Sequence, residues 1–140
     1  MGRQTTCEIW AVTRLLLDTH AALFWWAGSS KLSAEASEAI ADAEATIFLS
    51  TASCWEIATK FRIGKLAFVG DPQVHVPRLV AEHGFEMLPI SMDHGLQAGS
   101  LPSDHRDPFD RLIAAQALIE QLIVVSRDPE IAGFGCEVLW

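Results

Sequence analysis

The sequence predicts an α/β fold in which a mainly parallel sheet carries helices on both of its faces. Short apolar runs of strand type alternate with helix-start and helix-stop signals along most of the chain, and consecutive parallel strands need a helical crossover between them. In addition, the chain has 140 residues, of which half are apolar, and these values are typical of one globular domain.

In the first half of the chain, the expected elements follow from apolar runs and helix caps. Ser33 is the residue type of an N-cap, and Gly64 follows a segment that is expected to end as a helix. In chain order we expect a strand over 14–18, a helix over 21–27, a helix from 33 to about 44, a strand over 46–50 and a helix over 53–62.

In the second half, three Asp-Pro pairs are typical of helix starts, with Asp as N-cap and Pro at the first helical position. We expect a helix over 71–83, a strand over 86–90, a helix from 91 to about 99, a loop over 100–106, a helix from 107 to about 121, a strand over 122–126, a helical turn from 128 and an edge strand over 136–140. Residues 1–13 show no clean period, so we expect a poorly ordered extension before a domain over residues 14–140.

Composition narrows the function classes. The chain has 10 Lys plus Arg against 18 Asp plus Glu, a net charge of −8, which repels nucleic acid unless a local feature reverses it. Its three cysteines are odd in number and have no zinc-binding spacing, which predicts a reduced, cytoplasmic protein. Charged residues interrupt the most apolar region, so we expect neither a membrane span nor a signal peptide.

Four carboxylates lie where the predicted fold places a ligand site. In an open parallel sheet, ligands bind beyond the carboxyl ends of the strands. Asp18 closes the first strand and Asp128 follows the strand over 122–126, while Glu56 and Asp110 each lie in the first turn of an expected helix. The sequence therefore predicts that all four surround one cleft.

Each of these acids also has a purely structural explanation. Glu56 lies three residues after a serine, as in a capping box. Asp107 and Asp128 precede prolines, as N-caps do, and Asp110 complements a helix dipole. Asp18 is the hardest to explain in this way, because it follows a buried strand, where an ionised group needs a partner. Capping and catalysis are compatible roles, and both stay open at this stage.

If these acids lie together in one cleft, the binding of a metal ion there is favoured. Like charges about 4–6 Å apart in a half-buried cleft repel by several kcal/mol unless a proton or a cation neutralises them. Oxygen-only ligation points to Mg²⁺, with Mn²⁺ as the alternative. Such a site predicts phosphodiester hydrolysis, and the bound cation would also turn a repulsive pocket into one that attracts phosphate.

Five segments of the chain carry a resemblance to a known family. They are LLLDTHAALFWW (15–26), SxxSCWEIATKFRIGKL (50–66), LPISMDHG (88–95), LPSDHRDPFDRLIAAQA (101–117) and VVSRD (124–128). Their combination resembles the PIN-domain family, and more narrowly the VapC toxins of bacterial type II toxin–antitoxin modules. The resemblance covers nearly everything from residue 15 to residue 140, and HRDPFDR before an apolar helix is its most specific part.

The resemblance implies a three-layer α/β/α sandwich that acts as a Mg²⁺-dependent endoribonuclease toxin, forms a homodimer and is inhibited by a cognate antitoxin. Carried over position by position, its catalytic and metal-binding acids are Asp18, Glu56, Asp110 and Asp128. Asp107 is either a fifth ligand or only the cap of its helix.

Several neighbouring side chains are candidates for supporting roles. The hydroxyls of Thr19 and Ser126 are adjacent to the acids and either support a ligand or cap the backbone. Arg106 and Arg111 either hold phosphate or pair with an acid such as Asp107.

A basic cluster and an aromatic block complete the candidates. Lys60, Arg62 and Lys65 either follow the RNA backbone or form a solvated helix end. The block that contains Trp25 and Trp26 is the candidate interface for a partner, with core packing as its alternative. The five histidines share no short spacing, and we expect no catalytic role for them.

Two other function classes compete with a nuclease. A PIN-like module that binds protein or RNA without cleaving is less favoured, because all the expected acids are present. A phosphotransfer domain with Asp18 as nucleophile is also less favoured, because the sequence lacks the second Asp of a DxD motif and a Lys near the end of the last strand.

Overall fold

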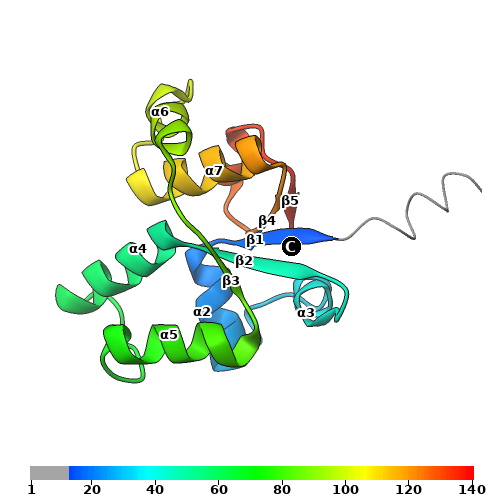
Figure 1. Ribbon diagram of the computed structural model, residues 1–140, viewed down its shortest axis with the longest axis vertical. Coiled ribbons are helices and arrows are strands. Elements are labelled where there is room, and N and C mark those ends of the chain that lie inside the picture. The colour runs from blue at the N-terminus through cyan, green and yellow to red at the C-terminus, as the bar shows by residue number, and fades with distance from the viewer. Residues whose placement is uncertain (1–12) are drawn as a thin grey trace, which may run out of the picture.

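The computed structural model describes residues 13–140, in which five parallel strands form one sheet between layers of helices (Figure 1). The strands are β1 (Arg14–Leu17), β2 (Thr46–Ser50), β3 (Glu86–Leu88), β4 (Ile123–Val125) and β5 (Val138–Leu139). The helices are α2 (Thr19–Ala27), α3 (Ala34–Ala41), α4 (Thr51–Arg62), α5 (Pro72–His83), α6 (Met92–Ser100), α7 (Pro108–Glu120) and α8 (Pro129–Gly133). The predicted fold class is confirmed. The extension expected over 1–13 lies, apart from Thr13, outside the described residues.

The strand order creates a crevice beside the central strand. The order across the sheet is β3-β2-β1-β4-β5, so the chain builds outward from β1 through β2 and β3 and then crosses to the other side of β1 for β4 and β5. The connections after β1 and after β4 therefore diverge, which is the switch point where open parallel sheets bind ligands. Residues 15–17 of β1 pair with residues 123–125 of β4 in register, so both strands end at the same level.

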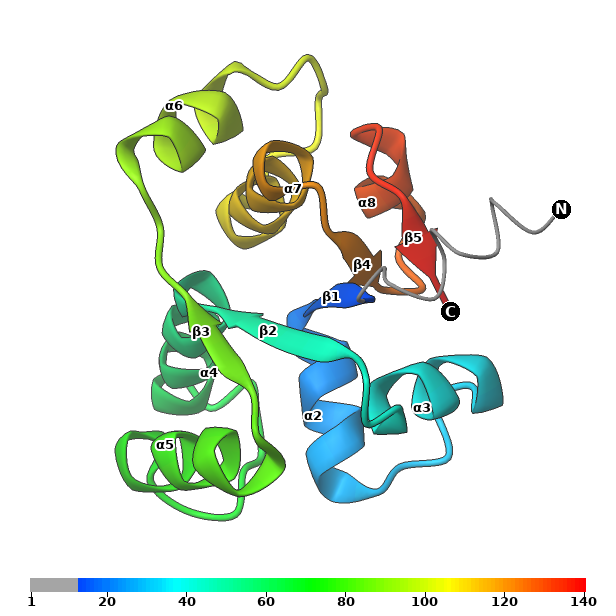
Figure 2. The same cartoon turned by 45° about the vertical axis from the view of Figure 1, so that its right-hand side comes forward.

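Alternate residues of β1 face two separate cores, as the two-residue period of a strand requires. Leu15 and Leu17 are fully buried among side chains of α2 and α3, whereas Leu16 is fully buried among side chains of α7 and α8. Figure 2 shows these two pairs of helices on opposite sides of the sheet. Full burial of each leucine stabilises the fold by about 1.5–3 kcal/mol, so β1 is a rigid base for the residues that follow it.

Helix α6 lies outside α7 and has little contact with the sheet (Figure 2). Its Ala98 packs with Leu101 against the small residues Ala114 and Ala115 of α7. Within residues 13–140, no helix has the length and apolar character needed to cross a membrane.

Two helices begin earlier than the sequence predicted. The Asp18 carboxylate accepts a hydrogen bond from the Ala21 N–H at 2.7 Å, so α2 starts directly after β1 instead of at Ala21. Likewise Ser50 caps α4 through the Ala52 N–H at 2.9 Å. The capping-box interpretation of Glu56 is therefore wrong, because Ser53, three residues before it, lies inside the helix.

Other boundaries shift by a few residues. Helix α3 ends at Ala41, before the expected end near residue 44, because the Asp42 carboxylate accepts the Glu44 N–H at 2.9 Å and forms a turn there. The strands over 86–90, 122–126 and 136–140 are shorter than expected, and only residues 86–88, 123–125 and 138–139 form strands. The helix starts at Asp71, Asp107 and Asp128 are as predicted.

Candidate active site

Asp18 and Asp128 follow the two strands that border the switch point. The Asp18 N–H donates to the Val125 carbonyl at 3.1 Å, which fixes the end of β1 to the end of β4. Asp128 follows β4 after two residues and caps α8 by accepting the Glu130 N–H at 2.9 Å. Both acids are therefore N-caps, and both lie at the carboxyl end of the sheet.

Burial governs the charge on Asp18. Its side chain is only 7% exposed. Burial raises its pKa, a side-chain hydrogen bond to Ser126 and the backbone bond from Ala21 oppose this shift, and the charge of Asp128 raises the pKa further. The net shift is upward. The charge of Asp18 thus lacks full compensation, and the hydroxyl of Ser126 contacts this acid directly.

Asp107 and Asp110 lie at the N-terminus of α7. Asp107 is the N-cap, since its Oδ1 accepts the N–H groups of Phe109 at 2.9 Å and Asp110 at 3.2 Å. Burial raises the pKa of Asp110 to about 6, and the nearby charges of Asp107, Asp128 and Glu56 add to the rise, against a lowering by His105. Asp110 therefore lies close enough to three other acids for their charges to raise its pKa.

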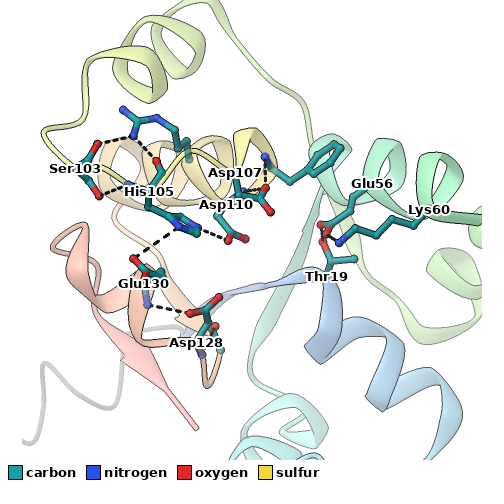
Figure 3. Close-up of polar contacts among 12 residues, drawn as sticks. Thr19, Glu56, Lys60, Ser103, His105, Asp107, Asp110, Asp128 and Glu130 are labelled. Atoms are coloured by element: carbon teal, nitrogen blue, oxygen red, sulfur yellow. Dashed lines mark hydrogen bonds and ion pairs between the residues drawn. The ribbon is translucent and has the colours of Figure 1, made fainter. Parts of the chain in front are cut away.

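His105 contacts Asp110, although we expected no catalytic role for this histidine. Its Nε2 lies 2.7 Å from Asp110 Oδ2, and its Nδ1 lies 3.7 Å from Glu130 Oε1 (Figure 3). The hydrogen bond to Asp110 is the main cause that raises the pKa of His105. The only sequence signal was its position in a short loop five residues before Asp110.

Arg111 holds the loop that carries His105. Its guanidinium donates to four backbone carbonyls, those of Ala98 (2.8 Å), Leu101 (2.7 Å), Ser103 (3.3 Å) and His105 (2.8 Å). In the described residues, Arg111 forms no ion pair with an acid. It therefore ties the end of α6 and the loop over 101–105 to α7, and so positions His105 beside Asp110.

Glu56 belongs to a second group of side chains on α2 and α4. It is only 4% exposed. The Thr19 hydroxyl donates to Glu56 Oε1 at 2.6 Å and is hydrogen-bonded to the Ser53 hydroxyl at 2.9 Å. Glu56 Oε2 pairs with the ammonium of Lys60, one helical turn further along α4 (Figure 3). Of the predicted basic cluster, Lys60 is thus engaged with an acid.

The structure brings the predicted acids to one end of the sheet. Within residues 13–140, however, no group of three or more His, Cys, Asp or Glu side chains is already arranged around a metal position. The charges still fit a hard divalent cation, because Asp18 and Asp110 both have raised pKa values that come partly from neighbouring carboxylates. A cation between these oxygen donors would relieve that repulsion.

A family model for the PIN domain matches residues 15–135, which include every predicted site residue. The chain belongs to the PIN domain family. PIN domains are generally nucleases and usually use divalent metals. The resemblance of the sequence motifs to this family is therefore confirmed.

Solved structures show the same PIN fold in toxin–antitoxin proteins. One is VapBC2 from Rickettsia felis bound to a DNA fragment from its promoter, with a TM-score of 0.64, 14% identity, and coverage of 91% of this chain and 98% of that one. Another is a toxin–antitoxin complex from Klebsiella pneumoniae, with a TM-score of 0.62, 17% identity, and coverage of 90% and 96%. FitAcB from Neisseria gonorrhoeae has a TM-score of 0.57, 18% identity, and coverage of 90% and 96%. No curated protein matches this PIN domain significantly.

Proposed function

We propose that this PIN domain is a VapC-like toxin, a Mg²⁺-dependent endoribonuclease that hydrolyses RNA phosphodiester bonds in the cytoplasm and is inhibited by a cognate antitoxin. The observation that carries the proposal is the placement of Asp18, Asp110 and Asp128 at the switch point of the sheet, where burial and the charge of Asp128 raise the pKa of the first two. Membership of a family whose members are generally nucleases supports it.

In this proposal, Asp18, Asp110 and Asp128 are the ligands of Mg²⁺, or of Mn²⁺ as the alternative. The bound cation would lower the pKa of a water and offset charge on the leaving oxygen. Glu56 completes the acidic group from α4, and Asp107 remains a cap that borders it. Backbone donors hold Asp18 and Asp128, a hydroxyl holds Glu56, and the His105 ring holds Asp110 before substrate arrives. Little rearrangement is therefore needed on binding.

Neighbouring side chains of the chain would support these acids. The Ser126 hydroxyl contacts Asp18, and the Thr19 hydroxyl contacts Glu56. His105 holds one oxygen of Asp110 and so directs the other, while Arg111 holds the loop that presents His105. Since Arg111 uses its donors on carbonyls, it acts by positioning and leaves phosphate contact to exposed cations such as Arg106.

An apolar groove on the PIN domain supports an antitoxin partner. It has a volume of about 690 Å³ and lies between α2, the segment over 66–69 and α5. Leu23, Phe24 and Trp26 line it, with the cations Lys31 and Arg78 beside them. The buried indole N–H of Trp26 has no acceptor among the described residues. An antitoxin segment with apolar and acidic residues would match this groove. A similar solved structure is a toxin–antitoxin complex, which also supports such a partner.

A homodimer is also part of the proposal. Helix α6 exposes Met92 (78%) and Leu96 (65%) on its outer side, next to the partly exposed Ile119 of α7. Such large apolar side chains gather at interfaces between copies of a chain. Analytical ultracentrifugation should give a dimer for the wild type and a monomer for Leu96→Glu, and a wild-type monomer would contradict this part.

The nuclease proposal is tested with matched oligonucleotides. Purified protein is incubated with single-stranded RNA and with DNA of the same sequence, in Mg²⁺ or in EDTA, beside the Asp18→Asn and Asp110→Asn variants. We expect RNA fragments only with Mg²⁺ and the wild type. Undiminished cleavage by both variants would contradict the site. No cleavage of any RNA by antitoxin-free protein would favour the alternative, a PIN module that binds without cleaving.

A further inference from the structure

The buried carboxylate of Glu56 is already neutralised by the chain itself. One of its oxygens accepts the Thr19 hydroxyl at 2.6 Å, and the other forms the ion pair with Lys60. The Glu56 side chain is 6% exposed and that of Lys60 is 35% exposed, and both residues line a surface pocket. Neither oxygen of Glu56 is without a partner.

The position of Lys60 follows from the helix that carries it. Glu56 and Lys60 are four residues apart on α4, with the acid nearer the N-terminus, which is the favourable order for such a pair. Lys60 also lies in the last turn, where the helix dipole favours a cation. The charges of Asp107 and Asp110 act on Lys60 in addition to that of Glu56. The ammonium of Lys60 is thus attracted by the charges of three acids at once.

Of the other acids, Asp110 is paired with His105, whereas Asp18 and Asp128 form no ion pair within residues 13–140. Among the described residues, Asp18 accepts hydrogen bonds from Ala21 and Ser126, and His20 favours its charged form from a distance. Asp128 accepts a backbone N–H from α8. Figure 3 shows Thr19, Glu56 and Lys60 as one group, separate from the group of His105, Asp110 and Asp128. The charge of Glu56 is therefore balanced by a lysine, whereas Asp18 and Asp128 at the switch point have no ion-pair partner among the described residues.

We propose that Lys60 takes the place of a second divalent cation, so that the site binds a single one, held by Asp18, Asp110 and Asp128, with Glu56 as a positioning residue and not a ligand. This inference rests on the proposed metal-dependent function. It predicts that removing Glu56 alone weakens metal binding, because the charge of Lys60 is then left unbalanced and repels the cation. Removing both charges together should restore binding.

The test is a double-mutant cycle read by Mn²⁺ titration, with bound ions counted by electron paramagnetic resonance. The wild type should bind one Mn²⁺ per chain. Asp110→Asn should weaken binding by at least about tenfold. Glu56→Gln should also weaken it, and the double variant Glu56→Gln/Lys60→Met should return to within about threefold of the wild type. Thermal unfolding of each variant confirms that it is folded.

The possible results separate the two proposals. A double variant as weak as Asp110→Asn would make Glu56 a ligand and overturn the inference. Two Mn²⁺ ions in the wild type would also overturn it while leaving a metal-dependent nuclease intact. No Mn²⁺ bound by the wild type at millimolar concentration would instead contradict the proposed function on which the inference rests.

Discussion

Asp110→Asn should stabilise the metal-free protein at alkaline pH while it impairs the proposed activity. The substitution keeps the shape of the side chain, and the amide oxygen can still accept from His105 Nε2, which now lies 2.7 Å from Asp110. What disappears is a buried charge that Asp107, Asp128 and Glu56 repel. A site built for a cation is expected to cost stability when no cation is bound.

The magnitude follows from the pKa. A rise in the pKa of Asp110 from 3.8 to about 6 corresponds to about 3 kcal/mol at 1.36 kcal/mol per unit. Because the Asp110 side chain is 20% exposed, solvent screening reduces this value, and we expect a gain of about 1–3 kcal/mol in the free energy of unfolding. For a domain of this size, that gain raises the melting temperature by about 4–10 °C.

The sign of the pH dependence is fixed by proton binding. Between pH 4 and 6 the folded protein holds the Asp110 proton more tightly than the unfolded chain does, so the free energy of unfolding falls as pH rises through this window. The penalty is complete above pH 6. The raised pKa of His105 gives a stabilising contribution that is present below pH 6.5 and is lost as pH rises through its folded value, so it does not offset the penalty at alkaline pH.

The assay is thermal unfolding by circular dichroism at pH 8 in EDTA, repeated at pH 4 and in Mg²⁺. Glu137→Gln, on the exposed surface, removes the same formal charge and should change stability by less than about 0.5 kcal/mol. Mg²⁺ should raise the melting temperature of the wild type and not that of Asp110→Asn. A variant that melts below the wild type at pH 8 in EDTA would refute the argument.

Three further predictions concern the residues around the acids. Arg111→Ala should lower the free energy of unfolding by about 2–4 kcal/mol, measured in urea, because four carbonyls lose a charged donor; a loss below about 1 kcal/mol would be inconsistent with this role. Thr19→Val should cost about 1–3 kcal/mol, since it leaves buried Glu56 short of a donor, whereas Thr19→Ser should retain most of the stability; equal losses would count against the hydroxyl contact. Expression without antitoxin should arrest bacterial growth, and Asp18→Asn should not, with culture density as the readout; equal arrest would detach toxicity from the acids.

Local sequence signals were sufficient for most of the fold. The three Asp-Pro pairs marked helix starts correctly, because an N-cap and a proline at the first turn are both satisfied by neighbours in the chain. The cap of α4 was misread for a physical reason. Ser50 and Ser53 are the same residue type, and only the end of β2 decides which one begins the helix.

The candidate site could be predicted as a list of acids but not as a set of contacts. That Asp18 and Asp128 follow neighbouring strands could be inferred from the alternation of strands and helices. The contact of His105 with Asp110, and the bonds of Arg111 to the loop before it, depend on how that loop folds over α7. No local sequence pattern specifies these contacts, because histidine and arginine side chains lie on the exposed surface in most places where they occur.

In the proposed function, the acids at the switch point form a nuclease centre and are more than helix caps. Asp128 and Asp71 allow a direct test, because each precedes proline and caps a helix through the same backbone bond, at 2.9 Å and 3.0 Å. Asparagine is an equally good N-cap, so both Asp→Asn variants should fold. We would measure the rate of Mg²⁺-dependent RNA cleavage for each. We expect a loss on the order of 100-fold for Asp128→Asn and none for Asp71→Asn. Equal rates for the two variants would mean that Asp128 is only a helix cap.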